Sequence, residues 1–203
     1  MRTIEPYRVK GLEMYSTLLW HLQKDAQLSF LARDLIEFDR TCPQTWCAVG
    51  NCFSLQKDHE SALRCFQRAI QLNPFFSYAY TLSGHEHVSN EDFEKAAICF
   101  RNSIRVDQRH YNAWYGLGMI YYRQEKFELA EFHFQKALDI NANSSVLYCY
   151  LGMVMHATKR YQESLKMYKK ASQIDPHNPL VKFKKAKLLF NLEEFQVCRL
   201  YFI

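Results

Sequence analysis

Glycine and proline are scarce in this sequence. Six glycines and five prolines stand among 203 residues, whereas hydrophobic residues make up 48% of the chain. Disordered and collagen-like segments have the opposite balance, so both are excluded, and no stretch has the composition of an interdomain linker. The prolines also avoid segment interiors, because Pro43 and Pro179 stand where predicted helices begin, and Pro74 and Pro176 stand where they end. This balance favours packed helices in one continuous array.

Long apolar runs and a strong charge of either sign are also missing. No uninterrupted apolar stretch reaches membrane-spanning length, and residues 1–11 carry charges without the apolar core of a signal peptide. We therefore expect neither export nor a membrane partner. The formal net charge is only +5, and basic residues are interleaved with acidic ones along most of the chain. Without a basic stripe, no nucleic-acid partner is expected.

The residue spacings that carry catalysis or bind metals are absent as well. The seven cysteines lack the short paired spacings of a zinc site, which indicates reduced residues of an intracellular protein. His85 and His87 are two residues apart and fall on opposite sides of a helix, unlike the four-residue spacing that brings two histidines onto one metal. No glycine-rich phosphate loop and no nucleophile paired with a base occurs. The sequence predicts a non-catalytic protein without a cofactor or metal.

A period of 34 residues runs through the sequence. A small residue recurs at Gly50, Gly84, Gly118, Gly152 and Ala186, an aromatic residue stands four places before each glycine (Trp46, Tyr80, Trp114, Tyr148), and alanine stands twelve places after the first three (Ala62, Ala96, Ala130). This pattern resembles the tetratricopeptide repeat (TPR), a pair of antiparallel helices. The resemblance implies an all-α TPR solenoid, a right-handed superhelix with one concave groove and no deep catalytic cleft.

The phase of the period divides the chain into three parts. Residues 1–42 form a degenerate helix pair or cap, residues 43–178 form four repeats (43–76, 77–110, 111–144 and 145–178), and residues 179–203 form a truncated fifth repeat. The fifth repeat is expected to reach about two turns into its second helix, which leaves the apolar residues 200–203 uncovered, as in a truncated piece of a longer array. The glycines have a steric reason, since the first helix of each pair must approach its partner closely there.

In a TPR array, positions two, five, nine and twelve of each repeat line the groove. The predicted peptide-groove residues are Gln44, Cys47, Asn51, Tyr78, Thr81, His85, Glu86, Asn112, Tyr115 and Met119, and Ser54, Val88 and Tyr122 share their phase. Amide side chains can pair with a peptide backbone or terminal carboxylate. Tyrosine and methionine can hold an isoleucine side chain, and a guanidinium needs a carboxylate such as Glu86 close to the rim.

Two other binding functions use helical repeats. A co-chaperone-type adaptor that binds acidic chaperone tails needs a clamp of basic residues and asparagine. The groove supplies Asn51 and Asn112, but no lysine at position nine before Lys187. RNA binding by helical repeats needs base-reading pairs in a basic groove, which the inward residues do not provide. The adaptor for another C-terminal peptide stays the alternative.

Several segments depart from the repeat consensus and resemble one family. These are Glu5–Gly11 (EPYRVKG), Tyr15–Thr17, Trp20–Asp25 (WHLQKD), Gly50–Gln56 (GNCFSLQ) and Arg105–Tyr122. They are similar to the TPR scaffold subunit of the anaphase-promoting complex (cyclosome) that receives the coactivator tail. The likeness covers essentially the whole chain and is strongest over residues 105–140.

The resemblance implies a non-catalytic member of a multisubunit ubiquitin ligase that acts in cell division, in the nucleus and cytoplasm. Its expected partners are the other subunits of the complex and the C-terminal Ile-Arg tails of coactivators and of a core subunit, which bind in the inner groove. The dimerising N-terminal repeats of the family and its final repeats have no counterpart in this sequence. Homodimerisation is therefore not expected.

Overall fold

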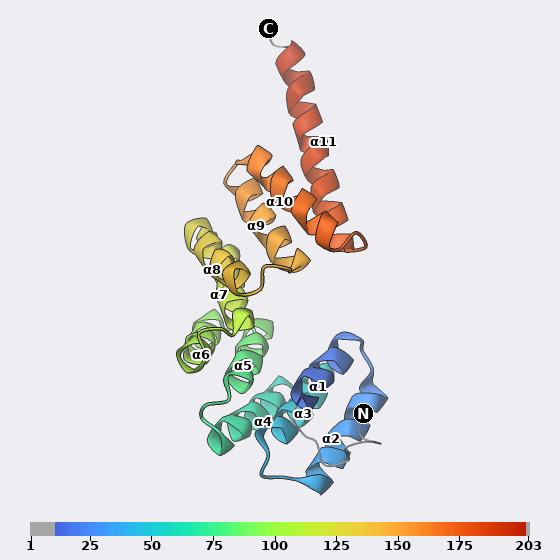
Figure 1. Cartoon of the computed structure of the whole chain (residues 1–203), viewed down its shortest axis with the longest axis vertical. Helices are drawn as coiled ribbons and strands as arrows, with labels where there is room; N and C mark the ends of the chain where they lie inside the picture. Colours follow the sequence, from blue (N-terminus) through green and yellow to red (C-terminus); the bar gives the residue numbers. More distant parts are fainter. Residues whose placement is uncertain (1–10, 202–203) are drawn as a thin grey trace. The chain divides into compact units, whose positions relative to one another are not determined.

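The computed structural model describes residues 11–201, with side chains up to residue 192, and this part of the chain consists of helices joined by short turns (Figure 1). The helices are α1 (Leu12–His21), α2 (Asp25–Phe38), α3 (Pro43–Leu55), α4 (His59–Leu72), α5 (Ser77–Ser89), α6 (Phe93–Val106), α7 (Tyr111–Arg123), α8 (Phe127–Ile140), α9 (Ser145–Ala157), α10 (Tyr161–Ile174) and α11 (Pro179–Tyr201). The predicted all-α fold is confirmed. None of the helices in the described range is long and apolar enough to cross a membrane.

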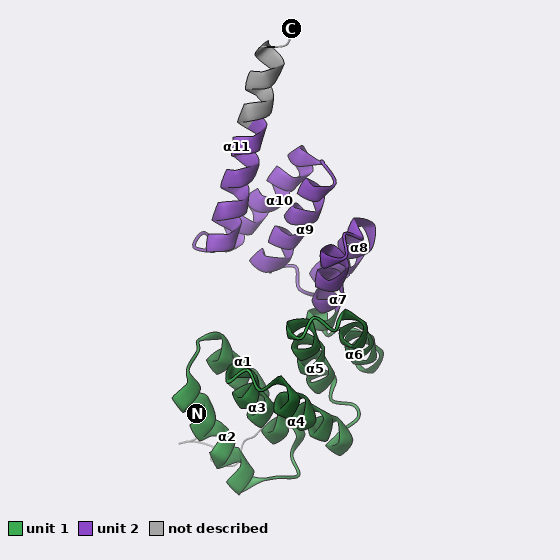
Figure 2. Ribbon diagram, turned by 180° about the vertical axis from the view of Figure 1, so that it is seen from behind, with its two compact units in different colours: residues 1–113 green, residues 114–203 purple. Residues whose placement is uncertain are grey.

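The chain divides into two compact units, residues 1–113 and 114–203 (Figure 2). In the first unit, α3 packs against α4 and α5 packs against α6, while the leading helices α1, α3 and α5 of successive pairs also contact one another. In the second unit, α9 packs against α10, and the leading helix α11 contacts both of them. Each unit is thus a stack of antiparallel helix pairs in which a helix touches its own partner and the next pair.

The glycine of each pair faces one aromatic ring. A Cβ atom built on Gly50 would lie 2.3 Å from Cε1 of Phe66, and a Cβ on Gly84 would lie 2.6 Å from Cε1 of Phe100. Gly118 faces Phe134 and Gly152 faces Tyr168 in the same way, also with 2.6 Å separations. Real Cβ atoms do not approach other atoms this closely, so the slot admits only hydrogen. The steric reason predicted for the repeating glycine is therefore correct.

Every turn from the first to the second helix of a pair contains one left-handed residue that is not glycine. These residues are Gln23, Lys57, Glu91, Glu125 and Lys159, with φ between 54° and 62°. They recur with the 34-residue period. At Glu91 the backbone N–H donates to the Val88 carbonyl, and the next N–H, from Asp92, donates to the His87 carbonyl. This pair of hydrogen bonds is the Schellman motif, which ends a helix and usually places glycine at the left-handed position.

Glu91→Gly should raise the free energy of unfolding by about 0.5–1 kcal/mol. Glycine adopts positive φ without the Cβ clash that glutamate has, and this relief exceeds the extra backbone entropy that glycine loses on folding. Urea denaturation followed by circular dichroism measures the change. Asn90→Gly is the matched control, because Asn90 lies one residue earlier with φ −86°. A gain in both variants, or in neither, would contradict a role for the left-handed conformation.

Asp92 is the N-cap of α6. Its carboxylate accepts a hydrogen bond from the Lys95 backbone N–H at 3.2 Å and pairs with Lys95 Nζ at 2.7 Å. The contacts with the Lys95 side chain and then with its backbone lower the pKa of Asp92. A folded-state pKa below the unfolded value contributes stability above the unfolded pKa, and this contribution is lost as the pH falls through the folded pKa.

The stability difference between the chain and an Asp92→Asn variant should therefore be larger at pH 7 than at pH 2.5. Denaturation midpoints in urea at the two pH values measure it. Asp25→Asn serves as the control, since Asp25 lies in the first turn of α2 but is not its N-cap. An equal difference for Asp92→Asn at both pH values would show that the cap acts without its charge.

The last helix differs from the prediction. The sequence predicts a turn and a second helix after residue 192, but α11 continues from Pro179 to Tyr201 without a break. Residue 193 has the phase of the left-handed turn residues, yet it lies within the helix. The segment holds no proline or glycine that would end a helix, and a second helix of about two turns gains too little packing to offset a costly turn. The predicted uncovered apolar side chains at residues 200–203 lie outside the described side chains.

Candidate functional site

The predicted groove residues belong to both units. Gln44, Cys47, Asn51, Tyr78, Thr81, His85, Glu86 and Asn112 lie in residues 1–113, and Tyr115 and Met119 lie in residues 114–203. Four of these side chains are fully buried: Cys47 and Thr81 at position five, Asn51 at position nine, and Glu86. The prediction of an inward-facing groove wall is corrected for these four.

Asn51 joins α3 to α1. Its Nδ2 atom donates to Ser16 Oγ at 2.9 Å and to Thr17 Oγ1 at 3.0 Å, and only 4% of the residue is exposed. Tyr78 on α5 donates its hydroxyl proton to the same Thr17 Oγ1 at 2.6 Å. These bonds bridge the leading helices of three successive pairs. Sequence reasoning missed Ser16 and Thr17, although Thr17 stands one period before Asn51.

Glu86 lies at the centre of a second polar network. Its Oε2 atom accepts a hydrogen bond from Ser54 Oγ at 2.7 Å, and its Oε1 atom pairs with His59 Nδ1. Ser54 in turn accepts from the indole N–H of Trp20 at 3.2 Å. The network therefore joins α1, α3, α4 and α5 through a carboxylate that is only 4% exposed. A guanidinium bound here would have to replace the His59 contact, because both carboxylate oxygens are already engaged.

The side chains at position five fill the space between neighbouring pairs. Cys47 is fully buried against Ala69 and Ala79. Burial raises the pKa of its thiol well above the usual value, so the group stays protonated and is a poor nucleophile. Thr81 Oγ1 lies 2.9 Å from Ser103 Oγ, in another interior contact between helices. Small residues at this position let the next helix approach, which is why they do not face the groove.

Three predicted groove residues of the first unit keep partial exposure. Gln44 accepts a hydrogen bond from the Cys42 thiol through Oε1 at 2.7 Å. The His85 ring meets the Phe100 ring edge-on, with 5.1 Å between the centroids, and burial lowers the pKa of His85 to about 4. Burial raises the pKa of Tyr78 to about 12. All three side chains are therefore neutral at physiological pH, and this surface can offer hydrogen bonds and aromatic contacts but little charge.

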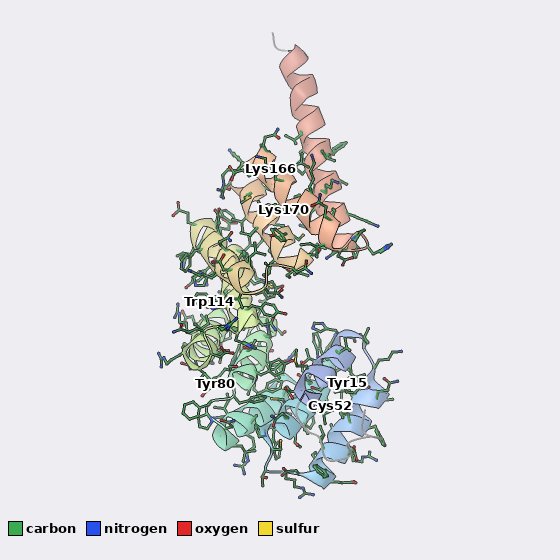
Figure 3. The ribbon with its side chains drawn as sticks, viewed as in Figure 1. Tyr15, Cys52, Tyr80, Trp114, Lys166 and Lys170 are labelled. Atoms are coloured by element: carbon green, nitrogen blue, oxygen red, sulfur yellow. The ribbon has the colours of Figure 1, made fainter. Side chains whose placement is uncertain are left out.

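In the second unit, aromatic rings cluster around Tyr115. Its ring contacts Tyr150 with the two rings nearly perpendicular at 5.3 Å, and it lies 6.1 Å from the Phe134 ring. Met119, one turn later on α7, is partly exposed. An apolar side chain of a peptide can be held by such a surface. Figure 3 shows the neighbouring aromatic residue Trp114 on α7.

Comparison with known proteins gives two findings. Family profiles of the tetratricopeptide repeat match residues 43–76, 77–110, 111–144 and 145–178. The chain is also similar to a group of cell-division proteins. It is 58% identical over 88 residues to Cell division cycle protein 27 homolog B of Arabidopsis thaliana, a match that covers 43% of the chain and 12% of that protein.

Two further relatives carry related names. Anaphase-promoting complex subunit 3 of Schizosaccharomyces pombe is 55% identical over 91 residues, which is 45% of the chain and 14% of that protein. Cell division cycle protein 27 homolog of Homo sapiens is 60% identical over 74 residues, which is 36% of the chain and 9% of that protein. The chain thus matches about an eighth of the length of these relatives. The resemblance to the scaffold subunit of the anaphase-promoting complex is confirmed.

Proposed function

The chain belongs to the tetratricopeptide-repeat family, and we propose that it is a non-catalytic scaffold segment of the anaphase-promoting complex that binds C-terminal Ile-Arg tails of coactivators. The observation that carries this proposal is the identity of 55–58% to segments of proteins named for that complex or for the cell division cycle. The same proposal places it with other subunits of the ubiquitin ligase, in the nucleus and cytoplasm of dividing cells.

The accessible part of the predicted groove supports recognition of an isoleucine. Tyr78 and His85 in the first unit, and Tyr115 and Met119 in the second, combine partial exposure with apolar surface. Each unit therefore offers a surface for an aliphatic side chain, and the amides of Gln44 and Asn112 offer hydrogen bonds to a peptide backbone. Burial of one isoleucine side chain contributes about 1.5–3 kcal/mol.

The arginine of the tail needs an acidic partner, and Glu86 is the predicted one. Its carboxylate lies on the path Trp20–Ser54–Glu86, and binding of a guanidinium would exchange the His59 contact for a charge-assisted one. Such a contact contributes about 1.5–3 kcal/mol. Together with one buried isoleucine, and less the cost of association, this predicts micromolar or weaker affinity for an isolated tail. Other contacts of the same partner would raise the effective affinity.

Fluorescence polarisation with a labelled peptide ending in Ile-Arg tests the proposal. The chain should bind the free-carboxylate peptide and bind an amidated copy or an Ile-Gln peptide at least ten-fold more weakly. Glu86→Gln keeps the shape of the side chain and should reduce affinity about ten-fold. Glu60→Gln on the exposed face of α4 should leave it unchanged. Equal binding of all three peptides, or no binding by a chain that circular dichroism shows to be helical, would refute tail recognition by this segment.

A further inference from the structure

The second unit contains a cavity of about 300 Å³ between α9, α10 and α11. It is lined by Tyr122, Met153, His156, Ala157, Lys159, Tyr161, Tyr168, Lys184 and Lys187. Three of these residues are lysines and none is acidic. A cavity whose charged groups are all basic favours an anionic ligand, because the low-dielectric wall strengthens the attraction.

Tyr168 sets this pair apart from the other three. Phe66, Phe100 and Phe134 occupy the equivalent place opposite the glycine, so the hydroxyl of Tyr168 is an addition that the packing does not require. The residue is fully buried, and its hydroxyl oxygen has no hydrogen-bond partner. Ser164, one turn earlier, donates its own proton to the Gly152 carbonyl at 2.7 Å. A buried hydroxyl without a partner is unfavourable, and a ligand that accepts its proton would remove that cost.

The protonation of the cavity wall fits an acceptor ligand. Burial raises the pKa of Tyr168 beyond the physiological range, so its hydroxyl keeps the proton and can donate it. Burial, and after it the charges of Lys187 and Lys184, lower the pKa of His156. The effect of the two lysines on His156 is what ammonium groups near the cavity produce. A hydroxyl donor at the wall and two positive charges near it form a carboxylate-binding arrangement.

We propose that this cavity binds a carboxylate of an apolar, acidic peptide, through the Tyr168 hydroxyl, Lys184 and Lys187. Met153 and Ala157 provide apolar surface for the residue next to the carboxylate, and the volume suits one or two side chains. The lysine side chains are long and flexible, so they can move to admit the ligand. The site is independent of the Ile-Arg tail site, because three lysines repel a guanidinium.

Three labelled peptides distinguish the sources of the carboxylate in fluorescence polarisation with the full chain. The first is acetyl-Ala-Leu-Glu-Leu-Ala-amide, which carries only a side-chain carboxylate. The second is acetyl-Ala-Leu-Leu with a free C-terminus, and the third is the neutral acetyl-Ala-Leu-Gln-Leu-Ala-amide. One or both carboxylate peptides should bind at least ten-fold more tightly than the neutral peptide. Equal binding of all three would overturn the proposal, as would saturation by inorganic phosphate without binding of either carboxylate peptide.

Variants assign the binding to the cavity. Tyr168→Phe should weaken the favoured peptide three- to ten-fold while the melting temperature stays the same or rises, since phenylalanine occupies this place in three other pairs. Lys184→Gln combined with Lys187→Gln should weaken it at least ten-fold. The matched control, Lys166→Gln with Lys169→Gln, removes the same charge from the exposed face of α10, where Figure 3 labels Lys166. If the control variant loses as much affinity as the cavity variant, the attraction is a general charge effect and the proposal fails.

The His156 ring gives a readout that does not depend on the label. A bound carboxylate offsets the two lysine charges, so the pKa of His156 followed by NMR should rise on addition of the peptide. The rise should be absent with the neutral peptide and in the Lys184→Gln, Lys187→Gln variant. Binding that leaves the His156 titration unchanged would place the peptide elsewhere and overturn the assignment.

Discussion

Gly84→Leu should lower the free energy of unfolding by about 3 kcal/mol. Even a single Cβ atom at this position would lie 2.6 Å from Cε1 of Phe100, whose side chain is fully buried. The larger side chain must push the ring out of its place or separate α5 from α6, and overpacking of a dense core typically costs about 1–3 kcal/mol. The upper end applies because the contact is with a rigid ring and not with the end of a flexible chain.

Urea denaturation followed by circular dichroism measures this loss. Ser89→Leu adds the same side chain at the exposed end of α5 and should change stability by less than about 0.5 kcal/mol. Combining Gly84→Ala with Phe100→Leu should restore part of what each change loses alone, because the smaller residue makes room for the added methyl group. Strictly additive losses in that double variant would show that the two residues do not compete for the same space.

Phe134→Ala should lower the free energy of unfolding by about 3–5 kcal/mol. The ring is fully buried against Gly118 and lies 5.4 Å from the Tyr150 ring. Its removal loses the transfer free energy of the side chain and leaves a cavity that the opposite glycine cannot fill. Because stability in repeat arrays is a sum of local terms, hydrogen exchange should show the loss first in α8 and α9.

Phe132→Ala is the matched control for that change. Phe132 lies two residues earlier on the same helix, but 51% of it is exposed, and its main contact is with Lys136 Nζ at 5.8 Å from the ring centre. Its replacement should cost no more than about 1 kcal/mol. A similar loss for both phenylalanines would show that helix propensity, and not burial opposite the glycine, decides the effect.

The repeat period was sufficient to predict the helix pairs and the contact that closes each of them. Gly50, Gly84, Gly118 and Gly152 return in one phase, and the same small slot appears in four copies, so local geometry carried the inference. The left-handed residues at Lys57, Glu91, Glu125 and Lys159 also follow that phase, but nothing in their side chains signals positive φ. The turn conformation becomes visible only in the backbone.

By itself, the sequence determined the fold class, the repeating glycine slot and the similarity to the scaffold subunit, because each depends on a pattern that recurs at fixed spacing. Only the tertiary structure decided which polar side chains are used inside the array. Asn51 and Glu86 share the phase of the groove, yet their partners Ser16, Thr17 and His59 come from neighbouring helices whose distance and side-chain length no period encodes. For the same reason, the unpartnered hydroxyl of Tyr168 could be recognised only after the packing around it was known.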